Sequence, residues 1–294
     1  MYPYLFSIPL PWSDDPFHVR SFGALVAIGF LFGAHVLQRL AARYTDNPED
    51  EQERWAQIVM WILFGVFGGA RLMYVVVEML RGSDTGQRYI DEPWTMFYFW
   101  EGGLVMYGGL AGGILAGVVK ARKLGVDALH GLDLAMVATF FAQAIGRVGC
   151  LAVGDDFGSK VPEAYRDLPF PITVHVPDPL PEGSLFGADN AGEILCATQP
   201  WMSVNALLLG FIALWILRRR RYRGQVLLWT LVLYSIGRFT IEAFRGDEIR
   251  GLWFNDTIST SQLISAIAGT MALLFLVKNR GRVDDDLPQP REAA

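Results

Sequence analysis

Residues 129–152, LHGLDLAMVATFFAQAIGRVGCLA, decide the fold, because they form a long apolar run that nevertheless contains an arginine. A helix needs roughly 17–25 mainly apolar residues to cross the hydrocarbon core of a bilayer. Arg147 lies near the end of this run, in the cluster Gly146-Arg147-Val148-Gly149-Cys150. A guanidinium in hydrocarbon costs at least about 2.5–3.5 kcal/mol on insertion scales, so Arg147 requires a partner or a ligand.

The rest of the chain has the same apolar character. Its 294 residues are 52% hydrophobic and only 19% charged, which is too apolar for an ordinary soluble domain. The 31 glycines fit a helical membrane protein, in which small residues permit close helix contact. We therefore predict an all-α polytopic membrane protein, with seven transmembrane helices and a small extracytoplasmic head. The predicted spans are Phe22–Leu40, Trp55–Val77, Leu104–Ala121, Leu129–Ala152, Trp201–Leu217, Val226–Phe244 and Ile258–Val277.

The connections between the spans divide the chain into four parts. A proline-rich connection forms the periplasmic head loop, and the alternating run Ile172–Val176 within it predicts a strand. An outer segment ends in an aromatic belt, which is typical of a re-entrant or interfacial helix. The C-terminal tail, with its acidic and proline-rich composition, is expected to be disordered. The first part, residues 1–152, contains helices one to four and the outer segment at about 81–103. The other parts are the head loop at 153–200, helices five to seven at 201–277 and the tail at 278–294. The aromatic belt consists of Trp94, Phe97, Tyr98, Phe99 and Trp100.

Most basic residues gather on one side of the predicted spans. If the N-terminus lies outside, this side is the cytoplasm, as the usual distribution of lysine and arginine requires. The tract Arg218–Arg221 is interpreted as a topology signal that touches anionic lipid heads, and not as a nucleic-acid site. The cytoplasmic basic residues are Arg39, Arg43, Arg54, Lys120, Arg122, Lys123, Arg218–Arg221, Arg223, Lys278, Arg280, Arg282 and Arg291.

A second intramembrane arginine, Arg238, lies in the cluster Gly237-Arg238-Phe239-Thr240-Ile241-Glu242, near the same membrane face as Arg147. A guanidinium presents a planar fork of donors that matches phosphate oxygens, so the two arginines predict a pocket for a phospholipid headgroup. Glu242 and Arg245 extend the cluster, and Glu242 can orient an arginine or accept a proton. Arg238 can also pair internally with Glu242 at a spacing of four residues, and such pairing can coexist with ligand binding.

Three further features are expected near this pocket. Arg71 is a third basic group in the outer half of its span, or else a snorkelling arginine that needs no function. Residues 101–113 hold six glycines, which either let a ligand approach the backbone or let helices pack tightly. Asp155 and Asp156 follow the fourth span directly and can reach the pocket, although solvated loop carboxylates are common at such positions.

Other polar residues are interpreted as structural. Asp133, inside the fourth span, is expected to be a buried partner of Lys120 or Arg122 if it faces the cytoplasmic half. Cys150 and Cys196 flank the head loop, and both a disulfide and two free thiols remain open. The four histidines are scattered, so no metal site is expected.

The order and spacing of these clusters resemble the prolipoprotein diacylglyceryl transferases, bacterial inner-membrane enzymes that begin lipoprotein maturation. The resemblance extends from the first span to the seventh, and the cluster around Arg147 is its most specific part. The landmarks are Gly68-Gly69-Ala70-Arg71, Glu101-Gly102-Gly103 with Gly108-Gly109-Leu110, Asp133, Gly146-Arg147-Val148-Gly149, and Gly237-Arg238 with Glu242-Ala243-Phe244-Arg245.

The resemblance implies a reaction, its partners and a location. The diacylglyceryl group of phosphatidylglycerol is transferred to the lipobox cysteine thiol of a prolipoprotein, which forms a thioether and releases glycerol phosphate. The partners are phosphatidylglycerol, lipobox peptides and membrane lipids, with no nucleic acid and no cofactor. The protein is implied to be multi-pass in the bacterial plasma (inner) membrane, with a periplasmic N-terminus and a cytoplasmic C-terminus.

The resemblance also assigns roles to individual residues. By position, Arg147 binds the phosphate of phosphatidylglycerol and belongs to a catalytic set with three other residues. The catalytic set is Arg147, Arg238, Glu242 and Tyr107, and the further substrate-binding residues are Arg71, Gly108, Gly109, Asp155 and Arg245.

The chain departs from the family pattern at the position expected to transfer a proton. Where the family commonly has a histidine before Gly-Gly-Leu, this chain has Tyr107, and a phenol ordinarily keeps its proton at neutral pH. Phe22 replaces a usual tyrosine, Cys150–Val153 replaces an asparagine-bearing stretch, and Gln199 replaces a histidine before Pro200. The alternative function is therefore a catalytically lapsed phospholipid-binding or lipid-handling membrane protein of the same fold.

Overall fold

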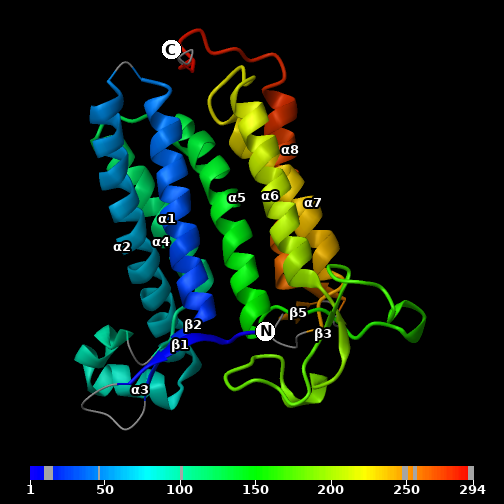
Figure 1. The fold of residues 1–294 in the computed structure, drawn as a ribbon. Helices are drawn as coiled ribbons and strands as arrows, with labels where there is room; N and C mark the ends of the chain where they lie inside the picture. The colour runs from blue at the N-terminus through cyan, green and yellow to red at the C-terminus, as the bar shows by residue number, and fades with distance from the viewer. Residues whose placement is uncertain (10–15, 46, 100–101, 247–250, 254–256, 291–294) are drawn as a thin grey trace. The chain divides into compact units, whose positions relative to one another are not determined.

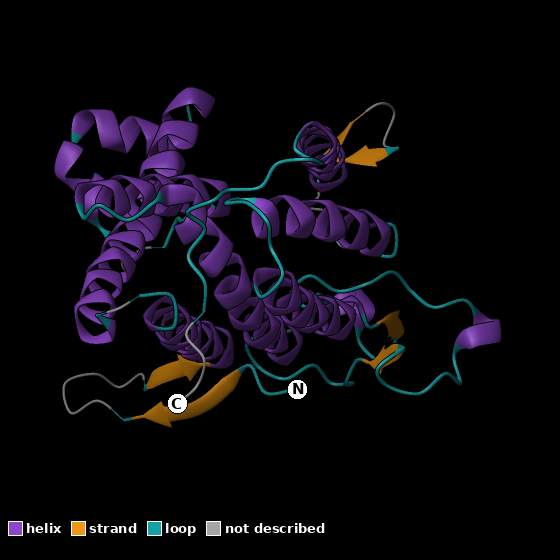
Figure 2. Ribbon diagram, turned by 90° about the horizontal axis from the view of Figure 1, so that it is seen from above, coloured by secondary structure: helices purple, strands orange, loops and turns teal. Residues whose placement is uncertain are grey.

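The computed structural model describes residues 1–9, 16–45, 47–99, 102–246, 251–253 and 257–290, and this part of the chain is mostly helical (Figure 1). Figure 2 shows that its strands are few and short, and they form three two-stranded antiparallel pairs. The helices are α1 Ser21–Ala42, α2 Pro48–Arg81, α3 Asp84–Asp91, η1 Pro93–Phe97, α4 Met106–Lys123, α5 Ala128–Val153, η3 Glu163–Tyr165, η4 Ala188–Asn190, α6 Thr198–Leu217, α7 Gln225–Glu242 and α8 Thr260–Lys278. The strands are β1 Tyr4–Ile8, β2 Phe17–Arg20, β3 Thr173–His175, β4 Ile194–Cys196, β5 Leu252–Trp253 and β6 Ile258–Ser259.

Some residues named in the sequence analysis lie outside the described part of the chain. They are Trp100 of the aromatic belt, Glu101 of the glycine cluster, and Arg291 with the last residues of the tail.

Each of the seven predicted spans coincides with a long helix. Five of these helices, α1, α2, α5, α6 and α8, are long and apolar enough to cross a membrane. The other two, α4 and α7, have 18 residues each and are the shortest of the seven. Three basic residues end α4, and α7 carries Arg238 and Glu242. The chain is thus a mostly helical, polytopic membrane protein, and a membrane crossing by α4 and α7 stays a prediction.

The chain forms two compact units. Unit 1 consists of Met1–Leu37 and Leu132–Pro288, and unit 2 of Gln38–Gly131 and Gln289–Ala294. Unit 1 therefore contains α6, α7, α8 and most of α1 and α5, together with the predicted head. Unit 2 contains α2, α3 and α4.

The helices of unit 1 pack through apolar and small residues. Phe140 and Ala144 of α5 form a buried cluster with Ala206 and Leu209 of α6. On another side of α5, Gly29 of α1 faces the backbone of α5 so closely that a side chain there would meet a carbonyl oxygen.

The head in unit 1 has a small core of its own. The predicted strand at 172–176 is found as β3, which pairs with β4 in an antiparallel register. Phe186 and Leu195 are completely buried at the centre of a cluster that includes Val174 and Val176. Both cysteines are free, so the structure favours two thiols over the disulfide.

A buried ion pair joins α5 to the loop before α7, and its partner differs from the predicted one. Asp133 is completely buried, as expected, but it accepts a hydrogen bond from Arg220 at 2.8 Å, and not from Lys120 or Arg122. The backbone N–H groups of Gly224 and Leu227 also donate to it, at 2.9 and 3.0 Å. Arg220, one member of the arginine tract, is therefore a structural residue and not a lipid contact.

The acidic tail is not wholly disordered either. Arg223 contacts Asp286 at 2.9 Å through two nitrogens, and its backbone N–H donates to Asp284 at the same distance. Asp284 also accepts from Arg282 at 2.8 Å. These ion pairs hold residues 284–286 against the loop before α7, so the expectation of a disordered tail is wrong for this part of it.

In unit 2 the glycine-rich helix α4 packs against α2 at very short distance. A β-carbon added at Gly112 would meet the carbonyl oxygen of Gly65, and one at Gly108 would meet that of Gly69. Glycine is therefore required at these crossings, because any side chain would push the two backbones apart. Of the two interpretations of the glycine cluster, the structure supports tight helix packing.

Candidate active site

The two arginines that opened the argument belong to one network of charges in unit 1. Arg147, near the end of α5, donates through Nη1 to the carboxylate of Asp156 in the following loop. Arg245, just after α7, donates through Nη2 to the other carboxylate oxygen of Asp156, at 2.6 Å. One carboxylate thus bridges two guanidinium groups, one from α5 and one from the segment after α7.

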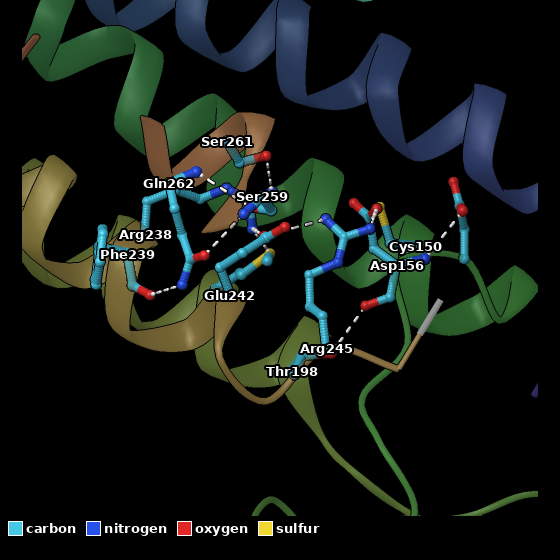
Figure 3. A network of polar contacts seen from close by, with 12 residues as sticks. Cys150, Asp156, Thr198, Arg238, Phe239, Glu242, Arg245, Ser259, Ser261 and Gln262 are labelled. Atoms are coloured by element: carbon cyan, nitrogen blue, oxygen red, sulfur yellow. Dashed lines mark hydrogen bonds and ion pairs between the residues drawn. The ribbon is translucent and has the colours of Figure 1, made fainter. Parts of the chain in front are cut away.

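The network continues along α7. Arg238 pairs with Glu242 at 2.8 Å, the internal pair that the spacing of four residues predicted. Glu242 is buried and lies 3.7 Å from Arg245, so Arg245 stands between the two carboxylates, as Figure 3 shows. Arg238 also donates to Ser261 at the start of α8, at 3.1 Å. Residues of α5, α7 and α8 therefore meet in one site.

The backbone of the head loop fixes the position of Arg245. The N–H of Ser159 donates to the carbonyl of Phe244 at 2.8 Å, and that of Gly246 donates to Phe157 at 3.2 Å. This short antiparallel bridge places the residue after α7 beside the loop after α5. The carboxylate of Asp156 and the guanidinium of Arg245 meet because their two backbones are paired.

The first turn of α6 holds the other side of that loop. The hydroxyl of Thr198 donates to the carbonyl of Asp156 at 2.8 Å, and the amide of Gln199 donates to the carbonyl of Asp155 at 2.9 Å. Thr198 and Gln199 are both fully buried. Gln199 therefore contacts the loop that carries Asp156.

The charges of the site do not cancel. It contains three guanidinium groups, of Arg147, Arg238 and Arg245, and two carboxylates, of Asp156 and Glu242. Burial raises the pKa of the Asp156 carboxyl, but Arg147 and Arg245 outweigh this effect and hold the pKa below its usual value. With these five groups ionised, the ion-paired set carries one positive charge in excess, and the carboxylate of Asp155 lies beside it. The guanidinium groups suit the oxygens of a phosphodiester.

Of the two acids that follow α5, Asp156 contacts both Arg147 and Arg245. The side chain of Asp155 accepts a hydrogen bond from the N–H of Asp156, at 2.9 Å. Asp156 has a left-handed backbone, with φ of 54°, and this conformation turns its side chain toward the arginines. Sequence alone gives no signal for it, because adjacent acids are equivalent until the backbone is known.

Arg71 has a structural environment in unit 2. Its side chain is buried, and its nitrogens donate to four backbone carbonyls of residues 95–103. The rings of Tyr74, Tyr89 and Phe99 surround its guanidinium at 5.6–5.8 Å. The snorkelling alternative is therefore wrong, because this arginine is enclosed by protein groups.

The remaining predicted site residues also belong to unit 2. Tyr107, in the first turn of α4, is 42% exposed. Gly108 and Gly109 are buried against α2. Tyr107, Gly108 and Gly109 therefore belong to unit 2, whereas Arg147, Arg238, Glu242 and Arg245 come together in unit 1.

Comparison with known proteins adds the family. Residues 9–278 match the sequence profile of the prolipoprotein diacylglyceryl transferases, which is nearly the whole chain. The chain belongs to this family. It is 30% identical over 279 residues to the phosphatidylglycerol–prolipoprotein diacylglyceryl transferase of Gloeobacter violaceus, with 93% of this chain and 94% of the relative covered.

Two further relatives of the same name show a similar degree of likeness. The protein of Paenarthrobacter aurescens is 30% identical over 289 residues, with 94% of this chain and 85% of the relative covered. That of Halalkalibacterium halodurans is 28% identical over 282 residues, with 95% and 89% covered. The match extends over both units, so membership of the transferase family applies to the whole chain and not to one part of it.

Proposed function

We propose that this protein transfers the diacylglyceryl group of phosphatidylglycerol to the lipobox cysteine thiol of prolipoproteins, the first step of lipoprotein maturation. Membership of the transferase family supports the reaction class. The single observation that carries the assignment of the site is the network around Asp156 and Glu242, where three guanidiniums meet two carboxylates. A net positive site at the end of membrane-embedded helices is what an anionic lipid headgroup requires.

The reaction needs two kinds of chemical help. The cysteine sulfur attacks the carbon of the diacylglyceryl group that carries the phosphate. A carbon–sulfur bond forms, and the bond between that carbon and the phosphate oxygen breaks. Glycerol phosphate leaves with the electron pair of that bond, and the thiol proton passes to a base. Guanidinium groups stabilise the negative charge on the departing phosphate, and a base or an electropositive site favours the thiolate.

We assign Arg147 and Arg238 to the phosphate, with Glu242 orienting Arg238. Arg245 contacts the carboxylates of both Asp156 and Glu242. It is proposed to hold these two carboxylates in place. Asp155 is proposed to act through the backbone of the loop next to it.

The remaining residues with a proposed role belong to unit 2. Tyr107 with Gly108 and Gly109 is proposed to line the side of the thiol. Arg71 is proposed to support the substrate through the backbone carbonyls that it binds, those of Thr95, Met96, Gly102 and Gly103.

The proposed setting is the bacterial plasma membrane, with seven transmembrane helices. The N-terminus and the head lie in the periplasm and the C-terminus lies in the cytoplasm. The concentration of arginine and lysine at one set of helix ends supports this orientation.

The test is a transfer assay with purified protein in vesicles that contain phosphatidylglycerol. A lipobox peptide is added, and the thioether product is detected by mass spectrometry. Product from the wild-type chain is expected, and Arg147→Ala should abolish it while the protein stays in the membrane. Arg81→Ala is the matched control, because Arg81 lies on the exposed end of α2. Absence of product from the wild-type chain, beside an active relative, would refute the proposal.

A second candidate function is phospholipid binding without transfer. The observation that favours it is Tyr107, at the position where the family commonly has a histidine. This candidate predicts that phosphatidylglycerol copurifies with the wild-type protein and is lost in Arg147→Ala, while no thioether forms in either. Product formation by the wild-type chain removes this candidate.

A further inference from the structure

Asp156 is held in an unusual conformation at the centre of the charge network. It is the single residue other than glycine with a positive φ in the described ranges 1–9, 16–45, 47–99, 102–246, 251–253 and 257–290. Strained backbone of this kind persists only where the surroundings over-determine it, and it concentrates at functional sites. The observed outlier therefore prompts the question of what its carboxylate does.

Three contacts keep the backbone of Asp156 in this conformation. Its N–H donates to the side chain of Asp155, its carbonyl accepts from Thr198, and Gln199 binds the preceding carbonyl. Two of these groups come from the buried first turn of α6. The fold thus places the carboxylate of Asp156 independently of the arginines, and the arginines are aligned on it.

The carboxylate of Asp156 holds the ends of the two arginine side chains close together. Arg147 and Arg245 carry like charges and each gives one nitrogen to a different oxygen of Asp156. Without the bridging charge, the two guanidiniums repel each other and their long side chains regain rotamer freedom. The contacts of Arg147 within the described residues, to Asp156 and Cys150, both use Nη1. This arrangement leaves Nη2 for an oxygen of a phosphate.

We propose that Asp156 is a positioning residue for the donor lipid: it aligns Arg147 and Arg245 so that the site binds the phosphate of phosphatidylglycerol. This inference rests on the proposed function and deepens it. Asp156 acts through the arginines, so its loss weakens the binding of phosphatidylglycerol and leaves the binding of the lipobox peptide unchanged.

Two substitutions separate the charge of Asp156 from its backbone conformation. Asp156→Asn retains the shape of the side chain and removes the charge, and asparagine tolerates the left-handed region. Asp156→Gly removes the side chain, and glycine adopts a positive φ without strain. Both variants should therefore fold, and Asp167→Asn, at an exposed position of the head, is the matched control.

The experiment measures KM for phosphatidylglycerol in mixed micelles, KM for a lipobox peptide, and kcat. In both Asp156 variants, KM for phosphatidylglycerol should rise at least about tenfold, the change expected when one charge-assisted contact is lost. KM for the peptide should stay within about twofold of wild type, and Asp167→Asn should match wild type throughout. Asp156→Glu should recover part of the lost affinity, because it restores the charge.

A separate measurement of lipid binding keeps this inference apart from the proposed function. The shift in Tm on adding phosphatidylglycerol to the purified protein reports donor binding without chemistry. If the wild-type chain binds this lipid and yields no thioether, the proposed function fails, and the lipid affinities of the variants still decide the role of Asp156. Affinity within twofold of wild type in both variants overturns the inference. Tighter binding overturns it as well, because Asp156 would then compete with the phosphate.

Discussion

The contact of Asp133 with Arg220 gives the sharpest prediction on stability. Asp133 is completely buried and receives donors from one side chain and two backbone N–H groups. These donors come from the loop before α7 and from its first turn, so the carboxylate joins α5 to the start of α7. We predict that Asp133→Asn strongly destabilises the folded protein, although the two side chains have nearly the same shape.

The magnitude follows from the loss of one charge of a buried pair. Removing one partner of such a pair costs about 3–5 kcal/mol, because the other charge is left buried without compensation. At about 2 °C per kcal/mol for a chain of this size, Tm should fall by roughly 6–10 °C. The N–H groups of Gly224 and Leu227 donate to different oxygens of Asp133, so the single oxygen of asparagine can serve only one of them. The loss of that acceptor adds to the cost of leaving Arg220 without the carboxylate.

The assay is thermal unfolding in detergent, with a dye that becomes fluorescent on reaction with thiols. Cys150 is buried in the folded protein and becomes reactive when unit 1 opens. The double variant Asp133→Asn with Arg220→Met removes both charges and keeps one acceptor oxygen, so it should be more stable than Asp133→Asn alone, in which the charge of Arg220 loses its carboxylate partner. If Asp133→Asn lowers Tm by less than about 2 °C, the ion pair contributes little to stability and the reasoning is refuted.

Three further predictions concern other parts of the molecule. If the phenol takes part in proton transfer, Tyr107→Phe should reduce the rate of transfer and Tyr107→His should raise it. An unchanged kcat in both variants would exclude Tyr107 from the chemistry. Gly112→Leu should lower Tm by several degrees, because its side chain would meet the backbone of Gly65, whereas Gly281→Leu, at a position where an added β-carbon meets nothing within 4 Å, serves as the control. The carboxyl of Asp156 has a lowered pKa, so its contribution to stability is complete above the unfolded value and is lost as pH falls through the lower folded value. Thermal unfolding of wild type and Asp156→Asn should therefore differ at pH 7 and at pH 5, and a difference that disappears between these two values would contradict the lowered pKa.

The resemblance identified the family correctly, and Arg147 and Arg238 were among the residues on which it rested. Arg147 and Arg238 were predicted from their cost in hydrocarbon, and the structure brings them into one network. The partners of the charges were harder to predict. Arg220 was assigned to the lipid surface with the other arginines of its tract, yet it folds inward onto Asp133. Residues far apart in the sequence give no local signal of such pairing.

The membrane class and the number of long helices follow from the sequence by itself, because the thickness of a bilayer sets the length of each apolar run. The need for a partner at Arg147 follows in the same way, because hydrocarbon does not solvate a charge. Only the tertiary structure decided which carboxylate pairs with Arg147. Asp155 and Asp156 are neighbours of the same chemistry, and the left-handed backbone at Asp156, held by the first turn of α6, turns one of them toward the arginines. A choice that depends on a single φ angle and on contacts from a distant helix is made by packing, and no pattern in the sequence records it.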